Sequence, residues 1–175
     1  MHKYLQEMWR KPKTALGEAY KQRMASWRGQ PTLTRVVHPT RPDRARRLGY
    51  KAKQGFAVVR VRVKKGSRKT PKHAGGRRPA RAGRFFTLNK SKQQVAEEKA
   101  ARRYSNMEVL NSYWAGEDGS CEWFEVILVD RVHPSVAADK TAGFATLSKS
   151  RGRVFRGLTA SGRRARGLKN RAKTN

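Results

Sequence analysis

Acidic residues are scarce in this sequence, where 12 Asp and Glu stand against 42 Lys and Arg over 175 residues. The formal net charge is +30, and the isoelectric point is near 11.6. Folding does not require such an imbalance, and the repulsion between so many like charges opposes a compact state. We therefore expect an anionic partner, which could be nucleic acid, an anionic membrane or an acidic protein.

Cysteine and long apolar runs are also lacking. Cys121 is the only cysteine of the sequence, so an intramolecular disulfide cannot form, and a reducing compartment is the simple interpretation. No apolar run approaches the roughly 20 residues of a membrane span. The N-terminus has no apolar secretory segment. These absences predict an intracellular protein with no membrane as a partner.

The residues of common catalytic and metal sites are too few or too scattered to form one. The four histidines and the single cysteine show no zinc-ligand spacing. A G-x-S-x-G motif is missing, and the stretch that begins at Gly66 lacks the G-x-x-x-x-G-K-[ST] frame of a nucleotide-binding loop. The sequence therefore predicts no metal, no cofactor, no small-molecule substrate and no enzymatic activity.

The segment Glu108–Asp130 has the composition of an ordinary folded core. Two runs rich in β-branched and aromatic residues flank a five-residue turn, Gly116–Ser120, which predicts a β-hairpin. Apolar residues of the second arm alternate between two faces: Phe124, Val126 and Leu128 on one, and Trp123, Ile127 and Val129 on the other. Glu125 interrupts the second set, so we expect that face to be wet at this position. We expect the arm to be a central strand that is covered on both faces.

The charges mark the same region as the core. Residues 97–139 hold nine of the 12 acids and only four bases. The remaining segments are therefore much more basic than the chain as a whole, and they surround a small core of ordinary composition.

Helical periodicity appears near the N-terminus. Residues 2–10 predict a short helix that Pro12 ends. Thr14 is expected to cap a second helix that ends at Gly29. One face of this helix carries four large apolar residues: Leu16, Tyr20, Met24 and Trp27. We interpret this stripe as core packing, with stacking on RNA bases as the alternative.

The run Phe56–Lys64 alternates valine with basic residues, as a half-buried strand does. Val59, Val61 and Val63 are expected to face the core. The opposite face carries Arg60, Arg62 and Lys64, which either contact phosphates or are merely solvated.

A second helix of the core is predicted from Ser91 to about Tyr104. Ser91 and Gln94 have the spacing of a capping box. Glu97 and Glu98 are interpreted as acids of the first turn, which complement the helix dipole, and not as acid/base catalysts. A short helix is expected to begin at Pro134.

Three segments are basic and poor in apolar residues. Prolines hold Pro31–Pro42 extended, and Asp43 is expected to cap one helical turn that ends before Gly49. The segments Lys64–Arg84 and Lys149–Asn175 have no periodic apolar residues to bury, so we expect both to order only on a partner. A helical turn near Thr159–Arg166 is the exception.

Four stretches in this order resemble the archaeal and eukaryotic large-subunit ribosomal proteins of the L-fifteen-e family. They read HPTRPDRARRLGYKAKQG at 38–55, VLNSYWAGED at 109–118, FEVILVD at 124–130 and FRGLTASGRRARGL at 155–168. The compact length favours an archaeal type. The resemblance implies a structural constituent of the large ribosomal subunit, located in the cytoplasm. Its implied partners are large-subunit ribosomal RNA and neighbouring ribosomal proteins.

The resemblance also implies an α+β fold with a small β-α-β-β core and an antiparallel sheet, which agrees with the elements predicted from periodicity. N-terminal helices and long basic extensions complete the predicted architecture. We expect a core at 1–139 with an internal basic loop at 64–90, followed by a basic C-terminal extension at 140–175. A non-ribosomal nucleic-acid-binding protein, such as a chromatin protein or an RNA chaperone, is the alternative.

Charge pattern and resemblance together predict the RNA contacts, and Arg41–Lys53 is expected to be a principal one. The residues expected to bind RNA are Arg41, Arg44, Arg46, Arg47, Tyr50, Lys51, Lys53, Arg60, Arg62, Lys64, Arg68, Lys69, Arg77, Arg78, Arg153, Arg156, Arg163, Arg164 and Arg166.

Overall fold

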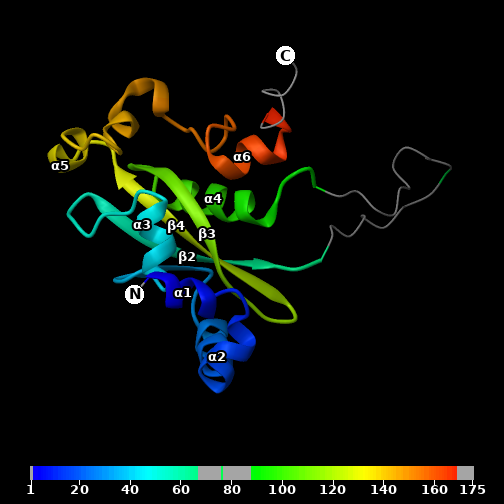
Figure 1. Ribbon diagram of the computed structural model, residues 1–175. Coiled ribbons are helices and arrows are strands. Elements are labelled where there is room, and N and C mark those ends of the chain that lie inside the picture. Colours follow the sequence, from blue (N-terminus) through cyan, green and yellow to red (C-terminus); the bar gives the residue numbers. More distant parts are fainter. Residues whose placement is uncertain (1, 67–75, 77–87, 169–175) are drawn as a thin grey trace, which may run out of the picture.

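The computed structural model describes residues 2–66, 76 and 88–168, and its centre is a four-stranded antiparallel sheet (Figure 1). The strands are β1 (Leu33–Val36), β2 (Phe56–Lys64), β3 (Met107–Glu117) and β4 (Cys121–Asp130), and their order is β1-β2-β4-β3. Helix α4 (Lys92–Arg103) lies between β2 and β3 in the chain. The predicted α+β class and the β-α-β-β order are therefore confirmed. Strand β1 was not predicted, because the prolines on either side of it indicated only an extended segment.

Strand β4 is central, as its uninterrupted apolar run predicted. It pairs with β2 on one side and with β3 on the other. Val126 and Leu128 have no exposed surface. The turn of the hairpin is shorter than expected, since pairing continues to Glu117 opposite Glu122 and leaves only residues 118–120 unpaired.

The prediction that Glu125 is wet is wrong, because this carboxylate has no exposed surface. It accepts hydrogen bonds from the hydroxyl of Tyr113 at 2.5 Å and from the backbone N–H of Thr40 at 3.0 Å, and the Thr40 hydroxyl also donates to it. The segment before α3 (Pro42–Arg47) therefore folds over this face and supplies the donors that a buried carboxylate requires. Burial and the charge of Glu125 raise the pKa of Tyr113 far above its usual range.

Helix α4 covers the valine face of β2. Val59 and Val61 are fully buried there against Ala96 and Ala100 of the helix, as predicted. Ser91 caps the helix and accepts a hydrogen bond from the Gln94 N–H at 3.2 Å. Small alanines at these positions let the helix approach the sheet closely.

The prediction that Glu97 and Glu98 occupy the first turn of α4 is wrong, since that turn holds no acid. Glu98 does pair with Arg102 one turn later, at 3.5 Å, and with Lys90 at 2.9 Å. Glu97 is fully buried instead, and it faces the C-terminal segment.

Helices α1 (His2–Met8) and α2 (Pro12–Gly29) lie on the other side of the sheet from α4 (Figure 1). Tyr20, Met24 and Trp27 of α2 pack on Ala115 and Trp123, so the apolar stripe is core packing, as we interpreted it.

The capping prediction for Thr14 is wrong, because the helix begins at Pro12 with Lys11 as its N-cap. Proline suits the first turn of a helix, because the backbone N–H that proline lacks would have no partner within the helix there. Gly17 kinks the helix through a left-handed φ of 48°.

The C-terminal segment forms α5 (Pro134–Ala137), two 3-10 turns at Gly143–Thr146 and Ser148–Ser150, and α6 (Ala160–Ala165). The predicted helix at Pro134 and helical turn near 159–166 are confirmed. The expectation that Lys149–Asn175 has nothing to bury is wrong for its described part, because Val154 is 1% exposed in the cluster between α4 and the sheet. A single valine among basic residues is too weak a pattern to indicate this. The boundary at 139/140 stays a prediction.

Candidate nucleic-acid interface

All three arginines of α3 are exposed, whereas two other residues of the helix are buried. Pro42 starts the helix, and Asp43 and Ala45 turn inward and are buried. Asp43 is therefore not the cap that the sequence predicted, since Arg41 takes that position. Three guanidinium-bearing side chains of the helix are exposed: Arg44, Arg46 and Arg47. Helical geometry thus points these charges in different directions over the surface.

Arg41 is half-buried and holds α3 against the N-terminal helices. Its guanidinium lies 4.8 Å from the centroid of the Trp9 ring and donates to the backbone oxygen of Trp114 at 3.3 Å. Burial lowers the pKa of Arg41, although an arginine remains charged at neutral pH.

Tyr50, Lys51 and Lys53 follow α3 in a loop that is fastened to α5. The Lys51 and Lys53 ammonium groups lie 2.8 and 2.9 Å from Oδ2 of Asp139. Hydrogen bonds from these two lysines and from Thr141 hold the pKa of Asp139 well below its usual range. The Tyr50 ring packs edge-on against Phe56, with centroids 6.4 Å apart. Part of the charge of this loop is therefore neutralised within the protein.

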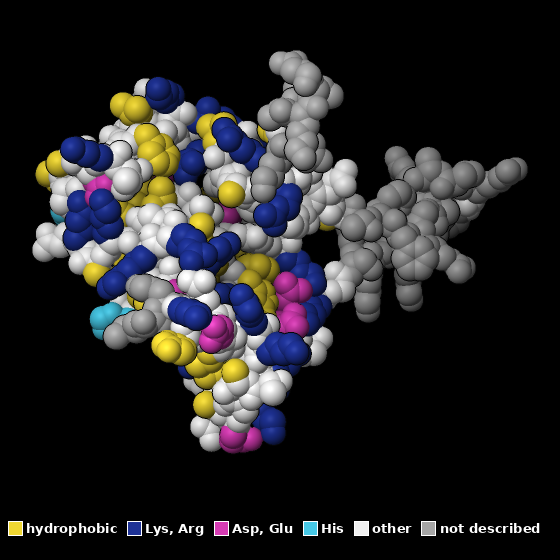
Figure 2. Space-filling model, in the orientation of Figure 1, with side chains coloured by type: hydrophobic (Ala, Val, Ile, Leu, Met, Phe, Trp, Pro, Cys, Tyr) yellow, Lys and Arg dark blue, Asp and Glu magenta, His cyan; other side chains and the backbone are white. Residues whose placement is uncertain are grey.

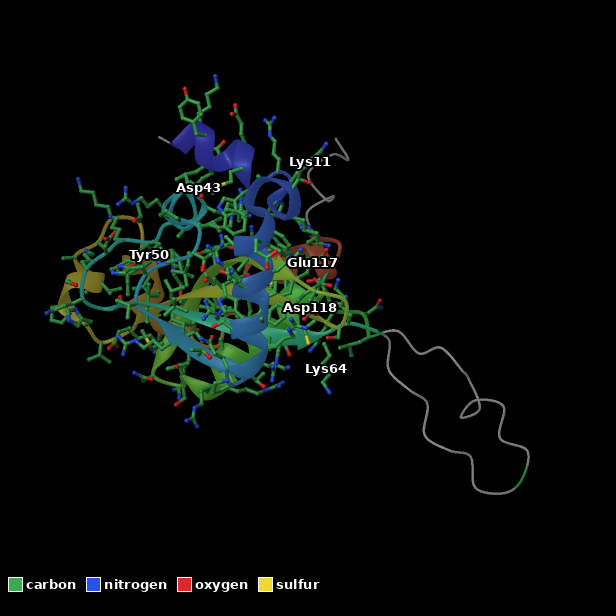
Figure 3. All side chains as sticks on the ribbon, turned by 90° about the horizontal axis from the view of Figure 1, so that it is seen from below. Lys11, Asp43, Tyr50, Lys64, Glu117 and Asp118 are labelled. Carbon is green, nitrogen blue, oxygen red and sulfur yellow. The ribbon has the colours of Figure 1, made fainter. Side chains whose placement is uncertain are left out.

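Two of the three bases of β2, Arg60 and Arg62, contact α2, and the third is exposed. Arg60 is 8% exposed, lies 4.1 Å from the centroid of Trp27 and donates to Gln30 Oε1 at 2.7 Å. Burial lowers the pKa of Arg60. The negative charge of Glu125, 3.8 Å away, acts in the opposite direction and raises this pKa. Arg62 donates to the backbone oxygen of Arg28 at 2.7 Å. Lys64 is exposed at the end of β2 near the hairpin turn (Figure 3).

The C-terminal arginines also fall into two groups. Arg153 is half-buried and donates to the backbone oxygens of Val109 and Leu110 at 2.7 and 3.0 Å, which fixes the loop before α6 to β3. Burial lowers the pKa of Arg153. Arg156 and Arg166 are exposed but donate to backbone oxygens of their own segment. Arg163 and Arg164 are exposed on α6.

Residues of α3 and α6 line the same cavity, which has a volume of about 340 Å³. Its rim carries Arg44 and Arg47 from α3 and Arg164 from α6, and its wall includes Asp43 and Trp114. We call it the α3–α6 cavity. Three of the four stretches that carry the family resemblance, at 38–55, 109–118 and 155–168, thus meet in space although they lie far apart in the chain. Figure 2 shows dark blue Lys and Arg side chains spread over this side of the molecule, with few acidic side chains between them.

Arg68, Lys69, Arg77 and Arg78 lie outside the described residues, as does most of the predicted mobile loop Lys64–Arg84. Sequence reasoning missed the polar residues Gln93, Asn111 and Ser112, which line the α3–α6 cavity. It also missed the buried contacts of Glu97. Nothing local in the sequence indicates either, because α4, β3 and α6 meet only in the folded chain.

Within residues 2–66, 76 and 88–168, His, Cys, Asp and Glu form no group of three or more that could bind a metal ion. In the same part of the chain no helix combines the length and the apolar character needed to cross a membrane.

Comparison with known proteins gives matches along the whole chain. The family model described as "Ribosomal L15" matches residues 1–175. The large ribosomal subunit protein eL15 of Methanocorpusculum labreanum is 52% identical over 173 residues, which are 98% of this chain and 88% of that protein. Those of Methanospirillum hungatei and Methanocella arvoryzae are 49% and 45% identical, over 99% and 98% of this chain and 89% of each protein.

Proposed function

This chain belongs to the ribosomal L15 family, and from that membership we infer that it is a structural constituent of the large ribosomal subunit. It works in the cytoplasm, where it associates with ribosomal RNA and with other ribosomal proteins. Its role is architectural and not catalytic, because the family is one of structural ribosomal proteins. The net charge of +30 suits this role, since an RNA backbone neutralises the repulsion that opposes the isolated fold.

The RNA surface that we propose is centred on the α3–α6 cavity. The observation that carries it is the meeting of Arg44 and Arg47 with Arg164 around one opening. Guanidinium groups form forked hydrogen bonds with phosphate oxygens, and their planes stack on bases. Arginines from two segments of the chain can therefore hold RNA strands that are not adjacent in the RNA sequence.

The predicted RNA-binding residues take different parts in this proposal. We assign direct contacts to the exposed side chains Arg44, Arg46, Arg47, Lys64, Arg156, Arg163, Arg164 and Arg166. Arg41, Arg60 and Arg153 are half-buried or buried, and they stabilise the protein beneath that surface. Lys51 and Lys53 are exposed, and Tyr50 and Arg62 are partly exposed. We assign these four residues a smaller part of the RNA contact, because their side chains also contact the protein.

Charge reversal on α3 tests the proposal. In the variant Arg44→Glu, Arg46→Glu and Arg47→Glu, we expect incorporation into large subunits to fall at least about tenfold, because each reversal replaces attraction to phosphate with repulsion. The near-UV circular dichroism should stay unchanged, since the three side chains are exposed.

A matched control reverses the same number of charges elsewhere. Lys21, Arg103 and Lys140 are exposed and lie outside the proposed surface, so their replacement by Glu should weaken incorporation much less. Equal losses in the two triple variants would show that only total charge matters. Normal incorporation of the α3 variant would contradict the proposed surface.

Sedimentation distinguishes the ribosomal role from that of a chromatin protein or an RNA chaperone. A structural constituent should remain with the large subunit through salt washes that remove loosely bound factors. Release of the chain in the first such wash would favour the alternative.

A further inference from the structure

The α3–α6 cavity is lined by two residues with buried polar atoms that have no hydrogen-bond partner in the described part of the chain. Asp43 is 5% exposed, and its Oδ1 has no hydrogen-bond partner among the described residues. Nε of Arg41 is also buried there without one. Both residues line the cavity, which has about 340 Å³. Buried polar atoms are nearly always paired in folded proteins, so an unpaired acceptor and an unpaired donor on two residues that line the same cavity indicate a ligand.

The charge of Asp43 restricts what that ligand can be. A carboxylate accepts hydrogen bonds and repels phosphate, so the interior of the cavity is a poor phosphate site. The group that enters must present an N–H or O–H donor. Amino groups of nucleobases and basic side chains of another protein both satisfy this requirement.

The rim decides between these two candidates. Arg44, Arg47 and Arg164 surround the opening, so a cationic side chain would be repelled on entry, whereas a phosphate would be attracted. A nucleotide carries both required parts: a phosphate for the rim and a base with N–H donors for the interior. Asp43 is buried on α3, and its label lies close to α1 in Figure 3.

The remaining lining suits a nucleobase. Trp114 is half-buried and provides an aromatic residue of the kind on which unstacked bases pack. The Gln93 amide is held in place by donating to the hydroxyl and the backbone oxygen of Ser112, both at 2.9 Å. A wall that is fixed before binding loses little freedom when the ligand enters.

We propose that the α3–α6 cavity takes in one unstacked nucleotide of RNA, with an exocyclic amino group of its base on Asp43 and its phosphate on the arginine rim. The proposal rests on the RNA-binding function inferred above and adds base selectivity to it. Cytosine, adenine and guanine carry such an amino group, whereas the only N–H donor that the base of UMP offers is that of its ring nitrogen N3.

The test titrates the purified chain with ribonucleoside 5′-monophosphates and follows the Trp114 indole and the Asn111–Tyr113 amides by NMR. CMP, AMP and GMP should move these signals at lower concentration than UMP does. Ribose 5-phosphate has no base and should leave them in place. Equal shifts with ribose 5-phosphate and CMP would reduce the cavity to an anion-binding patch and overturn the proposal.

The variant Asp43→Asn separates the base contact from general charge. Its loss of a negative charge should strengthen non-specific binding of anions, yet we expect the affinity of these signals for CMP to fall by about tenfold. Glu7→Gln makes the same charge change at an exposed site on α1 and should not lower it. An unchanged affinity in Asp43→Asn would contradict the proposal.

Two further measurements distinguish failure of this inference from failure of the proposed function. Carbodiimide cross-linking in large subunits that joins Asp43 to a lysine of another protein would assign the cavity to a protein partner and overturn the nucleotide. Incorporation of Asp43→Asn into large subunits should persist, because the exposed arginines remain. The inferred ribosomal function would fail only if the parent chain itself did not join the subunit.

Discussion

The buried carboxylate of Glu97 accepts a hydrogen bond from the hydroxyl of Thr159 at 2.7 Å, although 62 residues separate the two. Thr159 is the N-cap of α6, so this bond fixes the start of that helix to the middle of α4. The hydroxyl of Ser161 donates to the same carboxylate at 2.5 Å, and Ser112 of β3 also donates to it. Glu97 therefore holds in place the helix that carries Arg163 and Arg164.

Replacing Glu97 by Leu should release α6 and lower the free energy of unfolding by about 3 kcal/mol, because several charge-assisted hydrogen bonds are lost at once. Urea unfolding would measure the stability, and amide exchange at Ala160–Ala165 would report the helix. Glu98→Gln is the neighbouring control, since Glu98 pairs with partly exposed bases and should cost about 1 kcal/mol or less. Unchanged exchange protection of α6 in Glu97→Leu would contradict the anchoring role.

Strand β4 should not tolerate a charge in its centre. Val126→Asp or Leu128→Asp buries an unpaired carboxylate at a fully buried position, which costs several kcal/mol and approaches the whole stability of a small domain. We expect both variants to be unfolded by circular dichroism at room temperature. Val132→Asp introduces the same group at a position that is 86% exposed and should melt like the parent. Parent-like melting of Val126→Asp would mean that β4 is not buried as described.

Asp139 should make the stability dependent on acid pH. Lys51, Lys53 and Thr141 lower the pKa of this carboxyl in the folded chain, whereas the unfolded chain has the ordinary value of about 3.9. The stabilisation is therefore complete above about pH 4 and is lost as the pH falls through the lower folded value.

Urea unfolding between about pH 5 and pH 2 would measure this dependence. We expect Asp139→Asn to flatten the decline in stability relative to the parent. Glu7→Gln, at an exposed site, is the control and should leave the decline as it is in the parent. Identical slopes for Asp139→Asn and the parent would show that the two lysines do not stabilise the folded carboxylate.

RNA binding should depend steeply on salt. If about six to ten phosphates are neutralised, the affinity for large-subunit ribosomal RNA should fall by about three orders of magnitude between 50 and 200 mM salt. Filter binding at several salt concentrations would measure the slope. The triple Glu variant of α3 should show a shallower slope than the parent, because it neutralises fewer phosphates. A flat slope for the parent would mean that the contacts are not mainly with the phosphate backbone.

The sequence by itself determined the elements whose residues repeat with a clear period. Alternation of Val59, Val61 and Val63 predicted β2 with the correct bounds and the correct buried face. The unbroken run around Val126 predicted a central strand, because only a strand covered on both faces buries every side chain. Composition alone predicted an anionic partner, since no fold needs a net charge of +30.

Tertiary structure decided what each polar side chain does. Arg60 and Lys64 occupy equivalent positions of the same alternating strand, yet Arg60 lies under Trp27 and Lys64 is exposed, because α2 covers only part of β2. Glu97 and Glu125 became buried carboxylates only because hydroxyl donors reach them from segments far away in the chain. The α3–α6 cavity likewise exists only where two distant segments meet. Local periodicity records which face of an element is apolar, but the partner of a buried charge depends on long-range contacts that leave no local pattern.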